Sequence, residues 1–433
     1  MNSAQTRTVW PEMMPSVPDA SVLGREAALP PPVLRAGFVF ALLATTVFAR
    51  FGIGLTDDFS ISMGMVGLYV VAAALIWSGR ARLNPMGALL VAAVLFISAL
   101  SLFVNQNYAP WRRQVSLNSW ALLVMLYLPF ALGLRPGGDS RAMWLWLVRM
   151  HLAIMIAVTL CGIAQYAVQF VYRPVWLIDY TPLIPAPIRG SGLYNTSNAM
   201  STGLKSNGFF LREPSTFSAY TAFALLLEWS LFRRKWVLAL FGMGLMLSYS
   251  GSGLLVLAIA MMFPLGFTTL LRAAAAAAVL LVLYLLLGGV LNLDYTLGRV
   301  HEFGSDRSSA YCRFILPGKT AVEAIDAQSW VSLLGHGPGT MQKLTASCET
   351  TFGKVLFEYG LLGSLALIAL IVYSVRQPWV PLRSQAGFFV FWLVLGGHLL
   401  GPDALLIIFL LCAMWPRRPA ESSGETQDGV RYV

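Results

Sequence analysis

The chain has 433 residues, of which 57% are hydrophobic and only 12% are charged. A soluble domain carries about 25% charged residues, so this composition excludes an ordinary soluble protein. The net charge of +10 does not indicate nucleic-acid binding, because Lys and Arg stand singly or in pairs between apolar segments and form no basic block.

Residues 1–32 are polar and proline-rich, and they lack the basic start, apolar core and cleavage site of a signal peptide. We expect residues 1–34 to form a disordered cytoplasmic tail. About 12 apolar segments that are long enough for membrane helices follow. They cover about 36–55, 60–78, 86–104, 118–134, 143–170, 214–232, 235–249, 252–271, 273–291, 353–374, 385–400 and 403–415. The expected fold is an all-α polytopic membrane protein.

The positions of Lys and Arg predict the orientation, because short cytoplasmic connections are rich in these residues. With the N-terminus in the cytoplasm, every predicted inside turn is short and basic. These turns hold Arg80, Arg82, Arg135, Arg141, Arg233, Arg234, Lys235, Arg272, Arg376, Arg383, Arg417 and Arg418. The opposite turns at 56–59 and 401–403 contain acids and no base. We therefore expect a transmembrane bundle over 35–415, a second cytoplasmic tail at 416–433 and both termini inside.

Two long connections, 171–213 and 292–352, fall on the extracytoplasmic side in this arrangement, and loops of such length are usually functional. Both carry basic residues against the positive-inside trend. These are Arg173, Arg189, Lys205 and Arg212 in the first loop, and Arg299, Arg307, Arg313, Lys319 and Lys343 in the second. Guanidinium groups bind phosphate bidentately and stay charged. Together the loops predict a pyrophosphate site near the membrane surface; ordinary solvated loop charges are the alternative.

The run N-G-F-F-L-R-E-P-S at 207–215 ends the first loop and opens a helix. Glu213 and Pro214 suit a first helical turn, so helix capping alone could explain Glu213. Capping does not explain Arg212, because a positive charge at a helix start opposes the helix dipole. A functional role for Arg212 is the more economical interpretation.

The four cysteines form no C-x-x-C pair, and the sequence predicts no metal and no other cofactor. Cys161 and Cys412 lie in apolar segments and are interpreted as small buried hydrophobic residues. Cys312 and Cys348 lie in one extracytoplasmic loop, where disulfides persist. A bridge between them and two free thiols both fit the sequence.

Four segments, in order, resemble motifs of the O-antigen polymerase and O-antigen ligase superfamily of bacterial membrane glycosyltransferases. The segment G-F-F-L-R-E-P-S resembles the superfamily's G-x-F-x-E-P-S run, and Ser308–Phe314 resembles a serine-rich stretch ending in a functional arginine, here Arg313. Gly335–Gly339 resembles its G-x-G-x-G turn, and Phe357–Gly363 resembles the E-x-G-L-x-G helix that follows. The resemblance covers about residues 205–375; residues 1–180 contribute only a hydropathy pattern.

The chain departs from the superfamily pattern at two places. An S-R-[ST]-G turn is common between the two helices after E-P-S, and here the turn is Ser250–Gly253 with no base. Many ligase-type members place a His-Asn pair about nine residues before E-x-G, where this chain has Glu349 and Thr350. The second departure favours a polymerase over a ligase-type transferase, and the whole chain is most similar to polymerases of xanthan-type exopolysaccharide clusters.

The resemblance implies polymerisation of polyprenyl-pyrophosphate-linked oligosaccharide units at the outer face of the inner membrane. The implied partners are the lipid-linked substrate, membrane lipids, and flippase and chain-length or export proteins, with no nucleic acid. Arg212 and Arg313 are the main candidates for binding the pyrophosphate, supported by Arg189, Lys205 and Arg307. Glu349 is the candidate base, with His336 or His301 as substitutes. An exposed loop histidine and a plain surface carboxylate are the alternatives for His336 and Glu349.

A lipid-linked oligosaccharide flippase or another secondary transporter is the main alternative from a different class of protein. Such proteins carry ionisable residues near mid-membrane and often contain internal repeats with broken helices. Here His151, Glu228, Glu358 and His398 stand alone or near helix ends, and the halves of the chain show no repeat. A third hypothesis is that the protein is a passive scaffold of an export complex. This hypothesis predicts that the loop arginines are dispensable.

Overall fold

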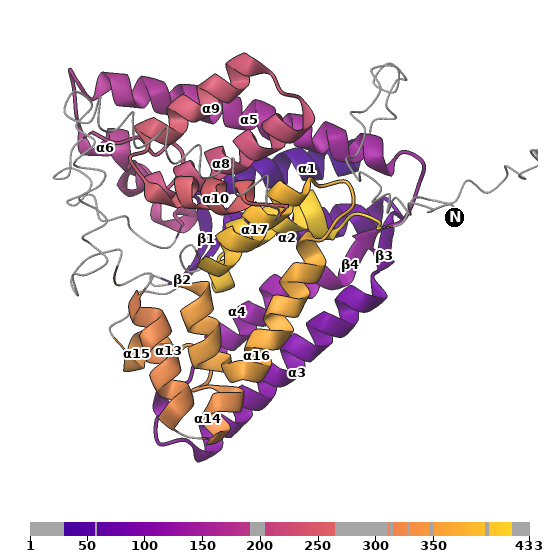
Figure 1. Cartoon of the computed structure of the whole chain (residues 1–433), viewed down its shortest axis with the longest axis vertical. Helices are drawn as coiled ribbons and strands as arrows, with labels where there is room; N and C mark the ends of the chain where they lie inside the picture. The colour runs from indigo at the N-terminus through magenta and orange to yellow at the C-terminus, as the bar shows by residue number, and fades with distance from the viewer. Residues whose placement is uncertain are drawn as a thin grey trace, which may run out of the picture.

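The computed structural model describes residues 30–56, 59–190, 204–264, 311, 315–327, 329–345, 350–394 and 398–417. Within these ranges the protein is mostly helical, as predicted (Figure 1). Four short strands add to the expected helices: β1 (Gly52–Thr56) pairs antiparallel with β2 (Phe59–Ser62), and β3 (Ala81–Leu83) pairs antiparallel with β4 (Leu132–Leu134).

Three of the described helices are long and apolar enough to cross a membrane: α3 (Pro85–Tyr108), α5 (Ser140–Val168) and α16 (Thr351–Val375). The shorter ones are α1 (Pro32–Thr45), α2 (Met63–Trp77), α4 (Leu117–Tyr127), α8 (Pro214–Leu231), α9 (Lys235–Leu247), α10 (Gly251–Met261), α17 (Leu382–Val394) and α18 (Pro402–Ile408). Each lies within or close to a predicted apolar segment. The predicted segment 273–291 lies outside the described residues.

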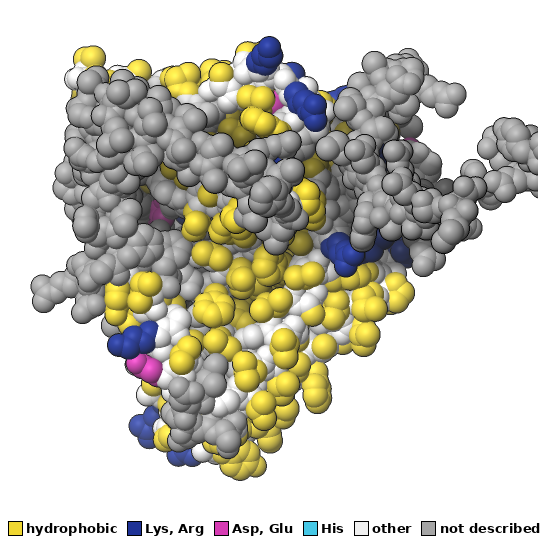
Figure 2. All heavy atoms as spheres, in the orientation of Figure 1, with side chains coloured by type: hydrophobic (Ala, Val, Ile, Leu, Met, Phe, Trp, Pro, Cys, Tyr) yellow, Lys and Arg dark blue, Asp and Glu magenta, His cyan; other side chains and the backbone are white. Residues whose placement is uncertain are grey.

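On α3, polar side chains are buried and large apolar side chains are exposed, the reverse of the pattern on a soluble helix. Its polar Ser98, Ser101 and Asn105 are buried, whereas Leu89 and Phe96 are 62% and 70% exposed. Contiguous exposed apolar surface is rare on soluble monomers. Figure 2 shows hydrophobic side chains spread across this face of the molecule, with Lys and Arg side chains at its edges. The pattern fits a membrane-associated protein.

The centre of the bundle is formed by α18 and the π-helical turn that continues it, Phe409–Ala413. From Ala404 to Trp415 every side chain is buried. A helix that is apolar on all sides belongs in a core. It contacts α1 and α2, and the indole Nε1 of Trp144 on α5 donates a 3.0 Å hydrogen bond to the carbonyl of Leu411.

The structure corrects the ends of the first predicted helix. The predicted segment 36–55 is too long, because α1 ends at Thr45 and the chain continues into β1. The hydroxyl groups of Thr45 and Thr46 both donate hydrogen bonds to the carbonyl of Leu42, and such bonds compete with helix continuation. At its other end α1 begins at Pro32, inside the predicted tail 1–34, since proline suits a first helical position.

The long predicted loops contain helical turns that the sequence did not indicate. The first holds the single turn α6 (Val175–Ile178) and two 3₁₀ turns, Thr181–Leu183 and Ala186–Ile188. The second holds α13 (Leu316–Ala327), α14 (Ser329–Leu334) and α15 (Met341–Leu344). Both α13 and α14 pack against α16 (Figure 1).

The connections between helices contact one another, and different sets of connections meet at the two ends of α3. At one end of α3, Arg80 pairs with Asp139 at 2.8 Å, and the Tyr373 hydroxyl donates a 2.7 Å hydrogen bond to the side chain of Asn84. Beyond its other end, the backbone N–H of Ser116 donates to the carbonyl of Pro338 at 2.8 Å. Elsewhere, the connection after α1 reaches the first long loop through the N–H of Gly190, which donates to the carbonyl of Arg50 at 2.9 Å.

Candidate functional site

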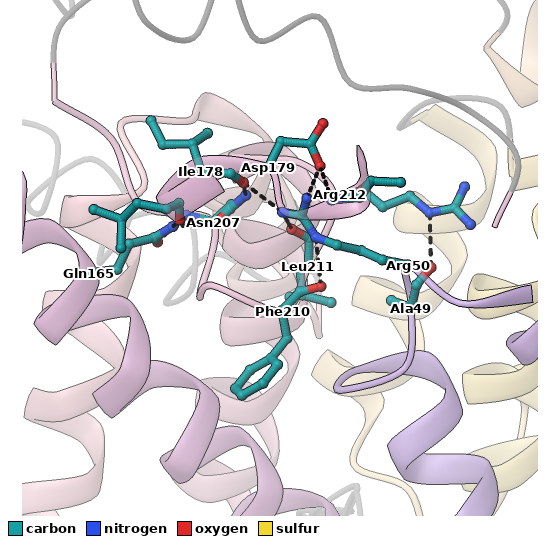
Figure 3. A network of polar contacts seen from close by, with 11 residues as sticks. Ala49, Arg50, Gln165, Ile178, Asp179, Asn207, Phe210, Leu211 and Arg212 are labelled. Carbon is teal, nitrogen blue, oxygen red and sulfur yellow. Dashed lines mark hydrogen bonds and ion pairs between the residues drawn. The ribbon is translucent and has the colours of Figure 1, made fainter. Parts of the chain in front are cut away.

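Arg50, just after α1, is a buried and heavily hydrogen-bonded side chain of the candidate site. It is 1% exposed although it carries a charge. Its guanidinium group donates to the carboxylate of Asp179, the hydroxyl of Thr181 and the carbonyls of Ile178, Phe210 and Leu211 (Figure 3). A buried charge is tolerated only when it is paired and hydrogen-bonded in this way. Arg50 therefore fastens the end of α1 to two separate parts of the first long loop.

Arg212 lies at the start of α8, next to Arg50, and returns the contact. Its Nε donates a 2.9 Å hydrogen bond to the carbonyl of Ala49, the residue before Arg50. Gly190 packs between the two, since a Cβ added there would lie 2.8 Å from the Arg50 carbonyl oxygen and 2.9 Å from the Arg212 guanidinium. The half-buried guanidinium group of Arg212 points away from that of Arg50 (Figure 3). The Nε of Arg212 is thus bonded to the backbone, and its two terminal nitrogens point away from the guanidinium group of Arg50 (Figure 3).

Tyr180 lies between Arg50 and an aromatic ring of the G-F-F-L-R-E-P-S segment. The Arg50 guanidinium carbon lies 4.7 Å from the centre of the Tyr180 ring, and the ring of Phe209 stacks at 5.2 Å and 25°. Burial lowers the pKa of Arg50, and the carboxylate of Asp179 opposes that shift. Burial also raises the pKa of Tyr180, opposed by the charge of Arg50. The guanidinium group of Arg50 thus contacts the Tyr180 ring, which in turn stacks on the ring of Phe209.

The turn before Arg212 has an unusual backbone that a glutamine side chain holds. Gly208 and Phe209 both have positive φ, 69° and 64°, and a non-glycine residue rarely adopts this conformation. The Gln165 side-chain oxygen accepts hydrogen bonds from the Ser206 hydroxyl at 2.9 Å and from the N–H groups of Asn207 and Phe209 at 3.1 and 3.3 Å. The fold thus imposes the conformation that presents Phe209 to Tyr180.

An acid from the other end of the chain completes the surroundings of Arg212. Asp403, at the start of α18, lies close enough to Arg212 for the two charges to interact. Its carboxylate also lies directly over Gly64 of α2, where an added Cβ would be 2.0 Å from the Asp403 oxygen. The starts of α2 and α18 are therefore in contact, and the charge of Arg212 at the start of α8 acts on Asp403.

The E-P-S segment, 213–215, and the start of its helix also contact the serine–glycine turn 250–253. The Ser252 hydroxyl donates a 2.9 Å hydrogen bond to the carbonyl of Ser215, and the N–H of Gly253 donates to the Ser218 hydroxyl at 3.1 Å. Glu213 precedes α8, but its carboxylate does not cap the helix; it accepts a 2.7 Å hydrogen bond from the Ser215 hydroxyl. Capping therefore does not account for Glu213.

The other two motif segments with described residues form a second cluster. The N–H groups of His336 and Gly337 donate to the carbonyls of Phe357 and Glu358 at 2.8 and 2.9 Å, which docks the turn Gly335–Gly339 on α16. Gly360 interrupts α16 with φ 63° and ψ −163°, and at this kink its missing side chain admits the backbone of Leu333. Gly335 and Gly360 are therefore needed for the backbone contact between the two motifs.

His336 is packed among aromatic rings. Its ring stacks on Phe357 at 4.2 Å and 7° and lies 4.6 Å from Trp111, whose Nε1 donates a 2.9 Å hydrogen bond to the His336 carbonyl. Burial lowers the pKa of His336, opposed by its hydrogen bond to the Phe357 carbonyl. The neutral imidazole is favoured, which is the form a general base needs. On α16, Lys354 and Glu358 are buried with 4.0 Å between Nζ and Oε1.

The predicted site residues fall into three groups. Arg212 lies beside Gly190, the neighbour of Arg189; the Arg189 guanidinium itself donates to the carbonyls of Ile184 and Pro182 in its own loop. Lys205 and His336 take part in other contacts: the Lys205 carbonyl accepts from Gln169, and His336 belongs to the second cluster. Outside the described residues lie Arg307, Arg313, Glu349, Cys312 and Cys348.

Sequence reasoning missed three residues of the group around Arg212, which we call the first cluster: Arg50, Asp179 and Asp403. Arg50 stands in the apolar segment 36–55 that hydrophobicity predicts as one helix, and a lone arginine in such a segment is the only sign of its role in the sequence. Asp179 and Asp403 had no motif around them. Their contacts join positions far apart in the chain, which no local pattern indicates.

Among the residues that the structure describes, no group of His, Cys, Asp or Glu side chains could hold a metal ion. Comparison of the chain with known protein families, with characterised proteins and with solved structures finds no match.

Proposed function

We propose that this protein is a membrane glycosyltransferase that polymerises oligosaccharide repeat units carried on polyprenyl pyrophosphate. The growing chain moves from its lipid onto the non-reducing end of a new lipid-linked unit at the outer face of the bacterial inner membrane. The observation that carries the proposal is the placement of Arg212, a half-buried guanidinium group fixed at a helix start by Ala49 and Gly190. Such a group suits a pyrophosphate.

We propose about 12 membrane spans with both termini in the cytoplasm. The contact of Arg80 with Asp139 and that of Ser116 with Pro338 support this arrangement, because each joins connections that the charge pattern assigns to the same side. The helix α3 lies between these two contacts. Its 24 residues span about 36 Å, enough to cross a hydrocarbon layer of about 30 Å.

The pairing of motif segments also supports the proposal. Of the segments that resemble polymerase motifs, 335–339 contacts 357–360, and 208–215 contacts the turn 250–253 that stands where the superfamily has its S-R-[ST]-G turn. Tight glycine contacts in both pairs leave no room for side chains. Motifs that contact one another are expected where a single site is assembled from several helices.

In the proposed reaction, the acceptor hydroxyl oxygen bonds to the anomeric carbon of the growing chain as the bond from that carbon to the pyrophosphate oxygen breaks. The hydroxyl proton passes to a base, and the lipid pyrophosphate leaves with added negative charge. Arg212, with Arg313 and Arg307 from the second loop, would stabilise that charge directly. Arg189 and Lys205 would support the binding of the pyrophosphate.

We propose Glu349 as the base, with His336 as the substitute. The ring packing of His336 favours its neutral form, which can accept a proton. The same packing covers one face of the imidazole with Phe357 and places Trp111 beside it. His336 therefore also has a plain structural role in docking its turn onto α16.

Purified protein given lipid-linked repeat units in detergent should produce a ladder of longer lipid-linked products. Arg212→Ala and Arg313→Ala should each abolish the ladder while the protein still inserts, because each removes charge aimed at the leaving group. Arg82→Ala is the matched control, since Arg82 is an exposed arginine of a predicted inside turn, away from the two long loops. It should leave the ladder unchanged.

Two results would contradict the proposal at different levels. No ladder from the wild-type protein, together with net movement of lipid-linked units across vesicles, would identify a flippase. Products of normal length from both arginine variants would remove the proposed site and leave the enzyme unassigned.

A further inference from the structure

Four exposed basic side chains lie together where α8 ends and α9 begins. Arg233, Arg234 and Lys235 follow one another in the short connection between these helices, and Arg149 comes from α5, which packs against α9. The guanidinium carbons of Arg149 and Arg234 lie 5.7 and 5.4 Å from the centre of one ring, that of Phe232. Because both charges stand beside the same ring, Arg149 and the connection form one group, which we call the basic cluster.

A buried acid holds the connection in shape and neutralises one of the four charges. The carboxylate of Glu228 on α8 accepts hydrogen bonds from the Nε and a terminal nitrogen of Arg234 at 2.9 and 2.7 Å, and from the Arg234 backbone N–H at 2.9 Å. The N–H of Arg233 donates to the Glu228 carbonyl at 2.7 Å, and Arg233 has a φ of 59°, which a non-glycine residue rarely adopts. Within the part of the chain that the structure describes, no acid pairs with Arg149, Arg233 or Lys235.

The position of Arg149 on α5 is unusual for a charge. This helix is long and apolar enough to cross a membrane, and Arg149 lies nine residues after its start at Ser140, about 13 Å along the axis. On the same side of the helix Ala153, Ala157 and Leu160 are exposed and apolar. The positive-inside pattern accounts for bases in a short connection, but it does not account for an exposed arginine on an apolar helix. A charge at such a position needs an anionic partner.

The side chain that follows the basic cluster is of the type found at membrane surfaces. Trp236 is 61% exposed, and its ring centre lies 6.0 Å from the guanidinium carbon of Arg234. Tryptophan is enriched at the level of lipid headgroups. Further along α9, Met243 and Met246 are exposed and apolar. The basic cluster therefore stands where an interfacial aromatic ring and the apolar surfaces of α5 and α9 begin.

We propose that the basic cluster binds the phosphate of an anionic phospholipid. Guanidinium groups bind phosphate oxygens bidentately and stay charged. Charge complementarity selects the headgroup: Arg149, Arg233 and Lys235 match a net negative charge, whereas the cation of a zwitterionic headgroup would be repelled by them. The Glu228 contacts hold the connection in place before the lipid arrives, which lowers the cost of ordering it on binding. The proposal is independent of the polymerase reaction and requires only that the protein lies in a membrane.

Native mass spectrometry of the full-length protein in neutral detergent, titrated with phosphatidylglycerol or phosphatidylcholine, provides the test. Phosphatidylglycerol should bind about tenfold or more tightly than phosphatidylcholine. Arg149→Gln and Lys235→Gln should each weaken phosphatidylglycerol binding about fivefold, the effect of one basic residue near an anionic lipid surface. Arg82→Gln is the matched control and should leave binding unchanged, since Arg82 is an exposed arginine of another predicted inside turn. Arg234 is kept, because it neutralises the buried Glu228.

Equal affinity for the two lipids, or an equal loss from Arg82→Gln, would show general attraction to the bilayer and overturn the proposal. Displacement of the lipid by inorganic phosphate or glycerophosphoglycerol would identify a soluble anion as the ligand and overturn it as well. Thermal unfolding separates binding from packing. Arg149→Gln should lose the stabilisation that phosphatidylglycerol provides and unfold like the wild-type protein in phosphatidylcholine. Equal destabilisation in both lipids would assign Arg149 only to packing against Phe232 and overturn the proposal.

Discussion

Arg50 and Arg212 each hold the backbone immediately before the other. Arg50 donates to the carbonyls of Phe210 and Leu211, and Arg212 donates to the carbonyl of Ala49. The two backbones are thereby held together while the two guanidinium groups point in different directions; Asp179 pairs with Arg50, and the charge of Arg212 acts on Asp403. The geometry of Arg212 consequently depends on a residue that has no place in any recognised motif.

Arg50→Met should destabilise the protein by about 3–5 kcal/mol, because it leaves the buried carboxylate of Asp179 without its partner. Asp179 is 2% exposed, so water cannot replace the guanidinium group. Adding Asp179→Asn should recover part of the loss, since the uncompensated charge is gone. Unfolding in mixed micelles measures all four proteins of the cycle. A double variant as unstable as the sum of the singles would show that the ion pair contributes nothing specific.

Arg212→Gln should reduce polymer formation by about 10²-fold or more, the usual effect of removing one stabilising donor from a developing charge. Arg189→Gln should have a smaller effect, because the Arg189 guanidinium already donates to the carbonyls of Ile184 and Pro182. Initial rates of ladder formation at matched protein levels provide the comparison. A larger loss from Arg189→Gln would reverse the assignment of the two arginines.

Phe209→Ala should be less stable than Phe209→Gly by about 1 kcal/mol, although glycine is usually the more destabilising residue. Both variants lose the stacking on Tyr180, but only alanine keeps a Cβ at φ 64°. Unfolding of the two variants under identical conditions isolates the backbone strain. Equal stability, or a more stable alanine variant, would mean that the turn relaxes when the ring is removed.

Gly335→Ala should disrupt the docking of its turn on α16. The added Cβ would lie 2.4 Å from the backbone carbon of Glu358, and φ is 71°. We expect a loss of about 2 kcal/mol or more in stability. Gly242→Ala is the control, since nothing lies within 4 Å of a Cβ at that position in α9, and it should stabilise by up to about 1 kcal/mol. Equal effects of both substitutions would contradict the tight contact.

His336 should make stability fall with acid. Burial lowers its pKa, so below about pH 6.5 the unfolded chain binds a proton that the folded protein resists. Stability present at neutral pH is lost as the pH falls through that range. His336→Phe keeps the stacking on Phe357 and should lessen the difference in stability between pH 7.5 and pH 5.5 (conditions chosen about one unit either side of that value). The same pH dependence in the variant would assign the effect to other groups.

Most of the helical pattern could be predicted from the sequence, because long apolar segments are a local property of the chain. Helix ends were less predictable: Thr45 and Thr46 end α1 through hydroxyl contacts that hydrophobicity does not record. Among Arg50, Asp179, Arg212 and Asp403, only Arg212 could be predicted, because a positive charge at a helix start opposes the helix dipole. Arg50 and Asp179 meet across the fold, and their pairing depends on tertiary packing alone.

The position of α18 in the chain determines when the core of the bundle can be completed during synthesis. It follows the other described helices along the chain, yet its residues from Ala404 to Trp415 occupy the middle of the bundle. The earlier described helices therefore lack the middle of their core until these last residues are made. A nascent chain stalled before Pro402 would lack the centre of its core, and it would lack the carboxylate of Asp403 that lies over Gly64. Assembly of the candidate site is consequently one of the last steps in making the protein.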